Sequence, residues 1–214
     1  MFKTCWAVAA RALSSAFTSL LLAALTVILM VACSAPPPEP QAAPFYSTEV
    51  SGLDYGRGIH IPDTEAHLRG LEDFKGSVAI LFFGFTSCPD VCPTTLAKLK
   101  AVRTNLGKDA ERIQVVLISV DPERDSAAKL RNYVKSFDPS FIGLRPEPAA
   151  LKSVLKEFRA IAEKAPSIET PDLYTVDHSG AVYIYDRSNH LKLITQYDFK
   201  VSELTADLSR LIRE

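Results

Sequence analysis

The stretch "SVAILFFGFTSCPDVCPTTLAKLK" (residues 77–100) decides the fold. Its first ten residues form a continuous apolar run rich in strand formers, which predicts a strand buried on both faces of a sheet. Pro93 suits the first turn of a helix, where its missing N–H costs nothing. Leu96 and Leu99 follow on the apolar face of that helix. A buried strand that leads directly into a helix predicts an α/β unit, with two cysteines on the connection.

The segments on either side extend this unit into an α/β domain. Further strands are predicted at 113–120, 141–145, 181–186 and 191–197, and further helices at 125–137, 148–158 and 201–213. Asp125 or Ser126 would cap the helix that begins near residue 125. Strand and helix alternate first, and a hairpin and a helix follow. This order predicts one domain with a mixed sheet and helices on both faces.

The charge balance argues against one class of function. The chain has 24 Lys and Arg residues against 25 Asp and Glu residues, a net charge of −1. Such a balance gives no electrostatic reason for nucleic-acid binding. Hydrophobic residues make up 47% of the chain, which is enough to build a core.

The amino terminus predicts export. Lys3 and Arg11 precede a long uncharged apolar run that can act as a signal peptide or a membrane helix. The run ends in "MVAC", which resembles a bacterial lipoprotein cleavage box, although Met30 stands where that box usually has Leu. The resemblance implies cleavage before Cys33 and lipidation of its thiol; the alternative is an uncleaved anchor. In both cases the basic residues stay in the cytoplasm. We therefore expect a membrane-anchored domain on the periplasmic side of the bacterial cell envelope.

Three segments are predicted on this basis. Residues 1–33 form the lipoprotein signal peptide or membrane anchor. Residues 34–44 hold five prolines and no apolar periodicity, which is typical of an extended tether. The folded domain is predicted to cover residues 45–214.

The cysteine count isolates one pair. Cys5 belongs to the leader and Cys33 would be lipidated, so Cys88 and Cys92 remain alone in an oxidising compartment. A disulfide across so short a loop removes little entropy from the unfolded chain, which argues against a purely structural bridge. A thiol near a helix start is readily ionised. Thiolate is both a nucleophile and a metal ligand, so redox and metal-binding roles stay open.

The spacing of the pair favours an ion. Residues i and i+4 share one face of a helix, so both sulfurs can reach one metal. Thiolates are soft ligands that select Cu(I), Zn or iron–sulfur clusters, and zinc or cluster sites usually need four ligands. Two thiolates therefore fit a low-coordinate Cu(I) ion best. Both methionines, Met1 and Met30, lie in the leader and leave the domain no thioether ligand.

A histidine could complete such a site. The chain has four, and three of them, His60, His67 and His190, are expected to be ordinary surface or packed residues. His178 differs by context because it is expected in a turn just before a strand of the predicted hairpin. Loops at strand ends are where functional sites gather.

Four segments together resemble the Sco/SenC family of copper-binding assembly proteins. They are "LFFGFTSCPDVCPTTLAKL", "ISVDPERD", "SFDPSFIGL" and "VDHSGAVYIYD", in the order found in the family. The resemblance implies a thioredoxin-like (peroxiredoxin-like) fold for residues 45–214. It also implies copper, as Cu(I), Cu(II) or both, bound by Cys88, Cys92 and His178. The family's task is maturation of the CuA site of cytochrome c oxidase, by metal delivery, by reduction of that site's cysteines, or both.

Two aspartates are candidates for supporting roles. Asp121 ends a predicted strand parallel to the one before the cysteines, so it is expected near them as an acceptor that orients a ligand. The alternative is a turn-forming Asp before Pro122. Asp90, between the cysteines, would shape the loop or face a partner.

Two other functions stay open beside the metallochaperone, which would be a binding protein and not an enzyme. A thiol–disulfide oxidoreductase would use Cys88 and Cys92 as a redox pair, and a thiol peroxidase would need no His178. A Cys88–Cys92 disulfide cannot ligate Cu(I), so a thiol reductant is expected as a partner. A periplasmic copper donor and the CuA-bearing subunit of the oxidase complete the expected partners.

Overall fold

The computed structural model describes residues 44–50, 52–166 and 174–214. The predicted signal peptide or anchor at 1–33 and the tether, apart from Pro44, lie outside these residues. Pro44–Glu214 forms one compact unit. Within the described ranges, no helix combines the length and apolar character needed to cross a membrane.

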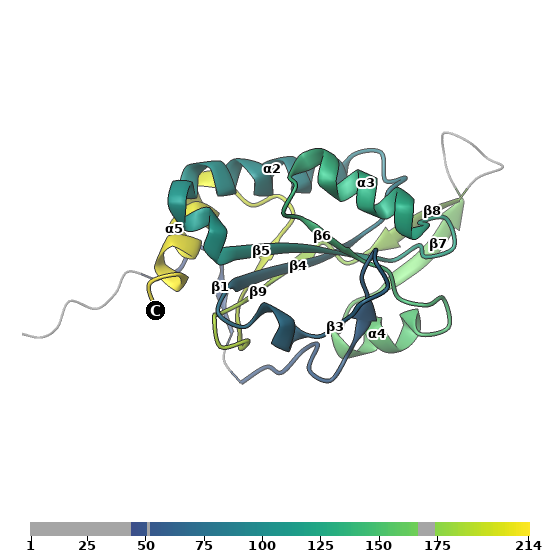
Figure 1. The fold of residues 1–214 in the computed structure, drawn as a ribbon, viewed down its shortest axis with the longest axis horizontal. Coiled ribbons are helices and arrows are strands. Elements are labelled where there is room, and N and C mark those ends of the chain that lie inside the picture. The colour runs from purple at the N-terminus through teal and green to yellow at the C-terminus, as the bar shows by residue number, and fades with distance from the viewer. Residues whose placement is uncertain (1–43, 51, 167–173) are drawn as a thin grey trace, which may run out of the picture. The chain divides into compact units, whose positions relative to one another are not determined.

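A six-stranded mixed sheet forms the centre of this unit (Figure 1). Its strand order is β1-β10-β9-β4-β5-β6, and β4 pairs in parallel with β5 and antiparallel with β9. The strands are β1 (Thr48–Glu49), β4 (Val78–Gly84), β5 (Ile113–Ser119), β6 (Ile142–Leu144), β9 (Ala181–Tyr185) and β10 (Leu191–Gln196). Every residue of β4 is buried, because this central strand is covered on both faces. The predicted mixed α/β sheet is confirmed.

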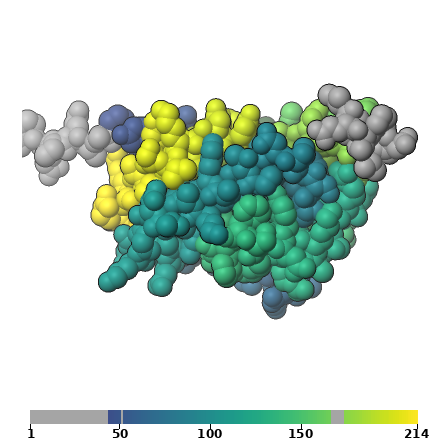
Figure 2. Space-filling model, turned by 90° about the horizontal axis from the view of Figure 1, so that it is seen from above, coloured from purple at the N-terminus to yellow at the C-terminus, as the bar shows by residue number. Residues whose placement is uncertain are grey.

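Helices cover both faces of the sheet. One face carries α2 (Val91–Leu106), α3 (Ala127–Phe137) and α5 (Val201–Leu211), which form the surface seen in Figure 2. Their apolar residues, including Leu96 and Leu99, share one core cluster with alternate residues of β4 and β5. The other face is covered by α4 (Leu151–Glu157) and the 3-10 helix η1 (Leu71–Phe74). A second 3-10 helix, η2 (Gly107–Arg112), links α2 to β5.

Two small antiparallel pairs lie outside the main sheet. They are β2 (Ile61–Pro62) with β3 (Leu68–Arg69), and β7 (Ala162–Pro166) with β8 (Tyr174–His178). The sequence did not predict either pair. β2 and β3 have only two residues each, too few to show a periodic pattern. β7 reads "AEKAP" and has neither β-branched residues nor period-two alternation. We call β7 and β8 the β-arm.

A buried carboxylate joins the turn after β5 to the loop after β4. Asp125 is fully buried and its carboxylate accepts hydrogen bonds from Ser119 Oγ at 2.7 Å and Thr86 Oγ1 at 2.5 Å. The backbone N–H of Thr86 donates to the same carboxylate. Ser126, and not Asp125, caps α3, since its Oγ accepts from the N–H of Lys129. Asp125 thereby fixes the start of the loop that carries the first cysteine.

Candidate metal site

The two cysteines leave the central strand and enter α2. Cys88 is half-buried on the connection after β4, and Cys92 is the second residue of α2, only 1% exposed. The sulfur of Cys92 packs against the end of β4 at Gly84. A Cβ at Gly84 would lie 2.7 Å from Cys92 Sγ and 2.9 Å from Leu117 Cδ1. Glycine at this position is therefore what leaves room for the buried sulfur.

The histidine comes from the β-arm. His178 is the last residue of β8, where it pairs with Ala162 of β7. The prediction that His178 lies in a turn is therefore wrong. The turn before β9 consists of Ser179 and Gly180, and His178 is the strand residue just before it. The reason is that the backbone of β8 is paired by β7, a partner strand that the sequence pattern did not reveal.

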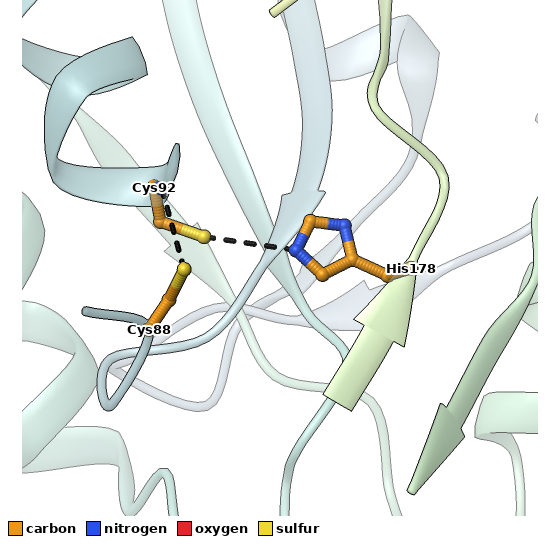
Figure 3. A group of neighbouring side chains, drawn as sticks. All are labelled: Cys88, Cys92 and His178. Atoms are coloured by element: carbon orange, nitrogen blue, oxygen red, sulfur yellow. Dashed lines mark hydrogen bonds between the residues drawn. The ribbon is translucent and has the colours of Figure 1, made fainter. Parts of the chain in front are cut away.

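The three side chains converge on one point (Figure 3). Their ligand atoms, the two Sγ atoms and one imidazole nitrogen, all lie within 4.8 Å of one another. Cys92 Sγ lies 3.8 Å from His178 Nε2, and the backbone N–H of Cys92 donates to Cys88 Sγ at 3.5 Å. Metal–sulfur bonds are about 2.3 Å long, so two sulfurs of a three-coordinate ion lie about 4 Å apart. The ligand atoms would therefore have to approach one another by about 1 Å or less to share one ion.

A backbone carbonyl orients the imidazole. His178 Nδ1 lies 3.0 Å from the carbonyl oxygen of Ser179. A carbonyl oxygen can only accept a hydrogen bond, so the proton of the neutral ring is on Nδ1. Nε2 then faces the two sulfurs, and in the neutral ring its lone pair is available to coordinate a metal.

The two thiols differ in acidity. Hydrogen bonds with the side chain of Cys92, with the imidazole of His178 and with the backbone N–H of Cys92 lower the pKa of the Cys88 thiol to about 4, against the effect of burial. The pKa of Cys92 is raised, first by its hydrogen bond to Cys88 and then by burial. Cys88 is therefore the thiolate at neutral pH, and Cys92 holds the proton until a metal or an oxidant removes it.

We expect this asymmetry to appear in alkylation kinetics. In the reduced, metal-free protein the rate at Cys88 should stay nearly constant from pH 8 down to pH 5.5, and fall only as the pH drops through about 4. An ordinary thiol loses about tenfold in rate per pH unit below its pKa of about 8.5. Iodoacetamide labelling with mass spectrometry of the labelled peptides measures both cysteines. A rate at Cys88 that falls tenfold per unit below pH 8 would contradict the assignment, and a Cys88→Ser control reports the slower Cys92.

Both cysteines are free thiols in the structure. The predicted Cys88–Cys92 disulfide thus concerns the oxidised form and stays a prediction. The proximity of the two sulfurs is compatible with it.

The two candidate aspartates lie around the site without joining the three-residue cluster. Asp90 precedes α2, accepts a hydrogen bond from Thr94 Oγ1 at 3.2 Å and lines the opening beside Cys88. Asp121 is buried, pairs with the guanidinium of Arg124 and accepts from Tyr174 Oη at 2.9 Å. The ligand-orienting acceptor expected of Asp121 is instead the carbonyl of Ser179.

An open pocket gives access to the sulfur of Cys88 and to the imidazole of His178. It measures about 330 Å³, and its lining includes Cys88, Asp90, Asp177, His178 and Tyr197. Cys92 is absent from its lining and contributes instead to a smaller, more enclosed space behind. A partner can thus reach the site from the side of Cys88 and His178.

The family model described as SCO1/SenC matches residues 53–213. The chain belongs to the SCO1/SenC family. This assignment rests on most of the chain and includes all three residues of the site. The thioredoxin-like architecture predicted from the sequence agrees with that of solved family members.

Two solved structures of the family are similar in sequence and in fold. Bradyrhizobium japonicum ScoI, solved with copper bound, is 36% identical with a TM-score of 0.66, over 74% of this chain and 99% of that one. The apo Sco1 protein of Thermus thermophilus is 34% identical with a TM-score of 0.69, over 80% of this chain and 99% of that one.

A curated relative is longer than the matched region. The mitochondrial SCO2 homolog of Danio rerio is 40% identical over 132 residues, which are 60% of this chain and 47% of that protein. The matched part of this SCO1/SenC chain therefore spans about half the length of that relative.

Several residues of the site were missed by the sequence reasoning. Gly84 makes room for Cys92, the carbonyl of Ser179 orients the imidazole, and Phe85 packs edge-on against the His178 ring with centroids 6.0 Å apart. A glycine inside a buried strand was the available signal for close packing. A backbone carbonyl and a ring contact leave no signal of their own in a single sequence.

Proposed function

We propose that this chain is a metallochaperone that binds copper through Cys88, Cys92 and His178 and assists maturation of the CuA site of cytochrome c oxidase. The observation that carries the proposal is the convergence of two thiols and one imidazole within 4.8 Å. Thiolates stabilise Cu(I), and imidazole also suits Cu(II). The copper in the similar Bradyrhizobium japonicum protein supports the same metal here.

The open side of the site suits delivery. Three protein ligands leave a coordination position free, as metal sites that exchange a ligand require. The pocket beside Cys88 lets a thiolate of the acceptor approach. We further propose that residues 1–33 attach the protein to the membrane, that residues 34–44 act as the tether, and that the domain works in the periplasm. A copper donor and a thiol reductant would act there as partners.

Copper loading and transfer test this proposal directly. The reduced protein is expected to bind one copper per chain and to pass it to the reduced, metal-free CuA-bearing subunit. The absorption of the acceptor's copper site measures the transfer. A chain that binds no copper, or binds it equally well with both thiols alkylated, would disprove the site. Binding without transfer would disprove the delivery role alone.

A thiol–disulfide oxidoreductase is the second candidate, favoured by the unequal acidity of the two thiols. The Cys88 thiolate would attack a target disulfide and release one target thiolate, and Cys92, on losing its proton, would then displace the second. Two electrons would pass to the target and leave a Cys88–Cys92 disulfide. Fast turnover on a model disulfide without copper would favour this function over metal delivery.

A further inference from the structure

The β-arm forms a sheet of its own, so the strand-to-strand hydrogen bonds of the main sheet do not hold it in place. Among the described strands β8 pairs with β7 alone, whereas the six-stranded sheet ends at β6 and at β1. His178 stands at the end of β8, while Cys88 and Cys92 stand between β4 and α2. The separation of the imidazole from the sulfurs is therefore set by the short Ser179–Gly180 connection to β9 and by side-chain contacts between the β-arm and the rest of the domain.

One arginine makes several of these contacts, beside the apolar packing of Val176 in the core. Arg124 pairs through Nε with the carboxylate of Asp121, and its Nη1 donates to the carbonyl oxygen of Tyr174 at 2.8 Å. Its guanidinium lies over the Tyr174 ring, 3.7 Å from the centroid, and Tyr174 Oη donates to Asp121. Tyr174 is the first residue of β8. The arginine thus holds the start of the strand that ends in His178.

The same guanidinium also reaches the other side of the site. It lies 5.7 Å from the centroid of Phe85, whose ring packs edge-on against the imidazole of His178. Phe85 begins the cysteine loop, and its carbonyl accepts from the N–H of Cys88 at 3.3 Å. Arg124 therefore contacts both the β-arm and the loop that carries the first sulfur.

A neighbouring ion pair is less able to hold the arm. Lys164 of β7 pairs with Glu123 at 2.6 Å, but these side chains are 50% and 57% exposed. Exposed pairs contribute little, because water and salt screen them. The side chain of Asp121 is fully buried, and a buried carboxylate needs its partner. The planar guanidinium can pair, donate and stack at once, which a lysine cannot do.

We propose that Arg124, held by Asp121, is a positioning residue that sets the distance between His178 and the two cysteines. The inference rests on the proposed copper site, since it concerns the placement of one of its ligands. It assigns a role to the segment "DPERD" that the metal ligands themselves do not explain. Asp121 then supports the site through Arg124 and Tyr174, not through a hydrogen bond to a ligand.

The test compares Arg124→Lys, His178→Ala and the double variant in Cu(II) titrations of the whole chain. Arg124→Lys keeps a positive charge beside Asp121, which protects the fold. It is expected to lower Cu(II) affinity about 10- to 100-fold, the usual effect of losing an outer partner of a metal ligand. In the His178→Ala background the same change should cost less than about twofold, because no imidazole remains to be misplaced.

Arg103→Lys is the matched control. Arg103 also pairs a half-buried guanidinium with an aspartate, Asp138, at 3.2 Å, and its Nη1 donates to two carbonyls, but it packs on the α2 side away from the β-arm. Its replacement should leave Cu(II) affinity within about twofold of wild type. Wild-type affinity in Arg124→Lys, or an equal loss with and without His178, would overturn the positioning role.

A metal-free measurement separates this inference from the proposed function. In the reduced apo protein, Arg124→Lys should speed amide hydrogen exchange in β8 and shift the ring resonances of His178, while Arg103→Lys does neither. If wild type bound no copper, the copper site would fail, and these apo signals would still decide the positioning role. Unchanged exchange and unchanged ring resonances would overturn it.

Discussion

Replacing His178 by Ala is expected to lower the affinity for Cu(II) by at least about 100-fold, since even an outer partner of a metal ligand is worth 10- to 100-fold. The affinity for Cu(I) should fall less, because the two thiolates remain and are the ligands that Cu(I) prefers. Cu(II) titration by absorption or electron paramagnetic resonance, with a competing chelator for Cu(I), measures both. The variant should also lose nitrogen coupling from the copper spectrum.

His190→Ala is the matched control for that experiment. His190 is 61% exposed and lies 3.6 Å from Asp186 in the turn between β9 and β10, outside the cluster of ligand atoms. Its replacement should change neither affinity. Wild-type binding of both copper states by His178→Ala would rule out the imidazole as a ligand and leave a site of two thiolates.

Asp125→Ala is expected to cost the domain about 3 kcal/mol or more of unfolding free energy. The change removes the acceptor of the buried Ser119 hydroxyl and of the N–H and hydroxyl of the half-buried Thr86, and a buried group left unpaired costs about 1–3 kcal/mol. Urea denaturation followed by circular dichroism measures the loss. The loop before Cys88 should lose its anchor at the same time, so slower copper uptake is expected with it.

Ser126→Ala provides the comparison, since Ser126 is adjacent and caps α3 with one hydrogen bond to Lys129. Loss of such a cap costs about 1 kcal/mol. If Asp125→Ala cost no more than Ser126→Ala, the carboxylate would not be the anchor described above. Asp125→Asn separates charge from shape, because the amide keeps one acceptor oxygen.

The elements that could be predicted are those whose burial leaves a pattern of apolar residues in the sequence. β4 and β5 are buried on both faces and read as continuous apolar runs, and α2 and α5 show apolar residues at helical spacing. The β-arm escaped prediction because β7 is mostly solvent-accessible and carries charged residues, with a proline at its end. Its pairing depends on β8, eight residues further along the chain. Short two-residue strands such as β2 and β3 give no periodic signal at all.

The candidate site also has a part that the sequence predicts and a part that it does not. The side chains that supply chemistry, Cys88, Cys92 and His178, were named from residue type, spacing and family resemblance, and the structure brings them together. The parts that shape the site could not be read in this way. They are a backbone carbonyl at Ser179, a missing side chain at Gly84 and a guanidinium whose partners lie 3 and 50 residues away. Such contacts exist only once the chain is folded.

The burial of Cys92 against Gly84 determines the order in which the copper bonds would be exchanged in the proposed transfer. An acceptor thiolate entering from the open pocket meets Cys88 and His178 first, while Cys92 Sγ stays enclosed by the end of β4. Ligand exchange would then proceed in a fixed sequence, with the Cys88–copper bond replaced early and the Cys92–copper bond broken last. Cys92 would keep hold of the ion until the acceptor has two bonds to it, so that copper passes between the proteins without being released to water.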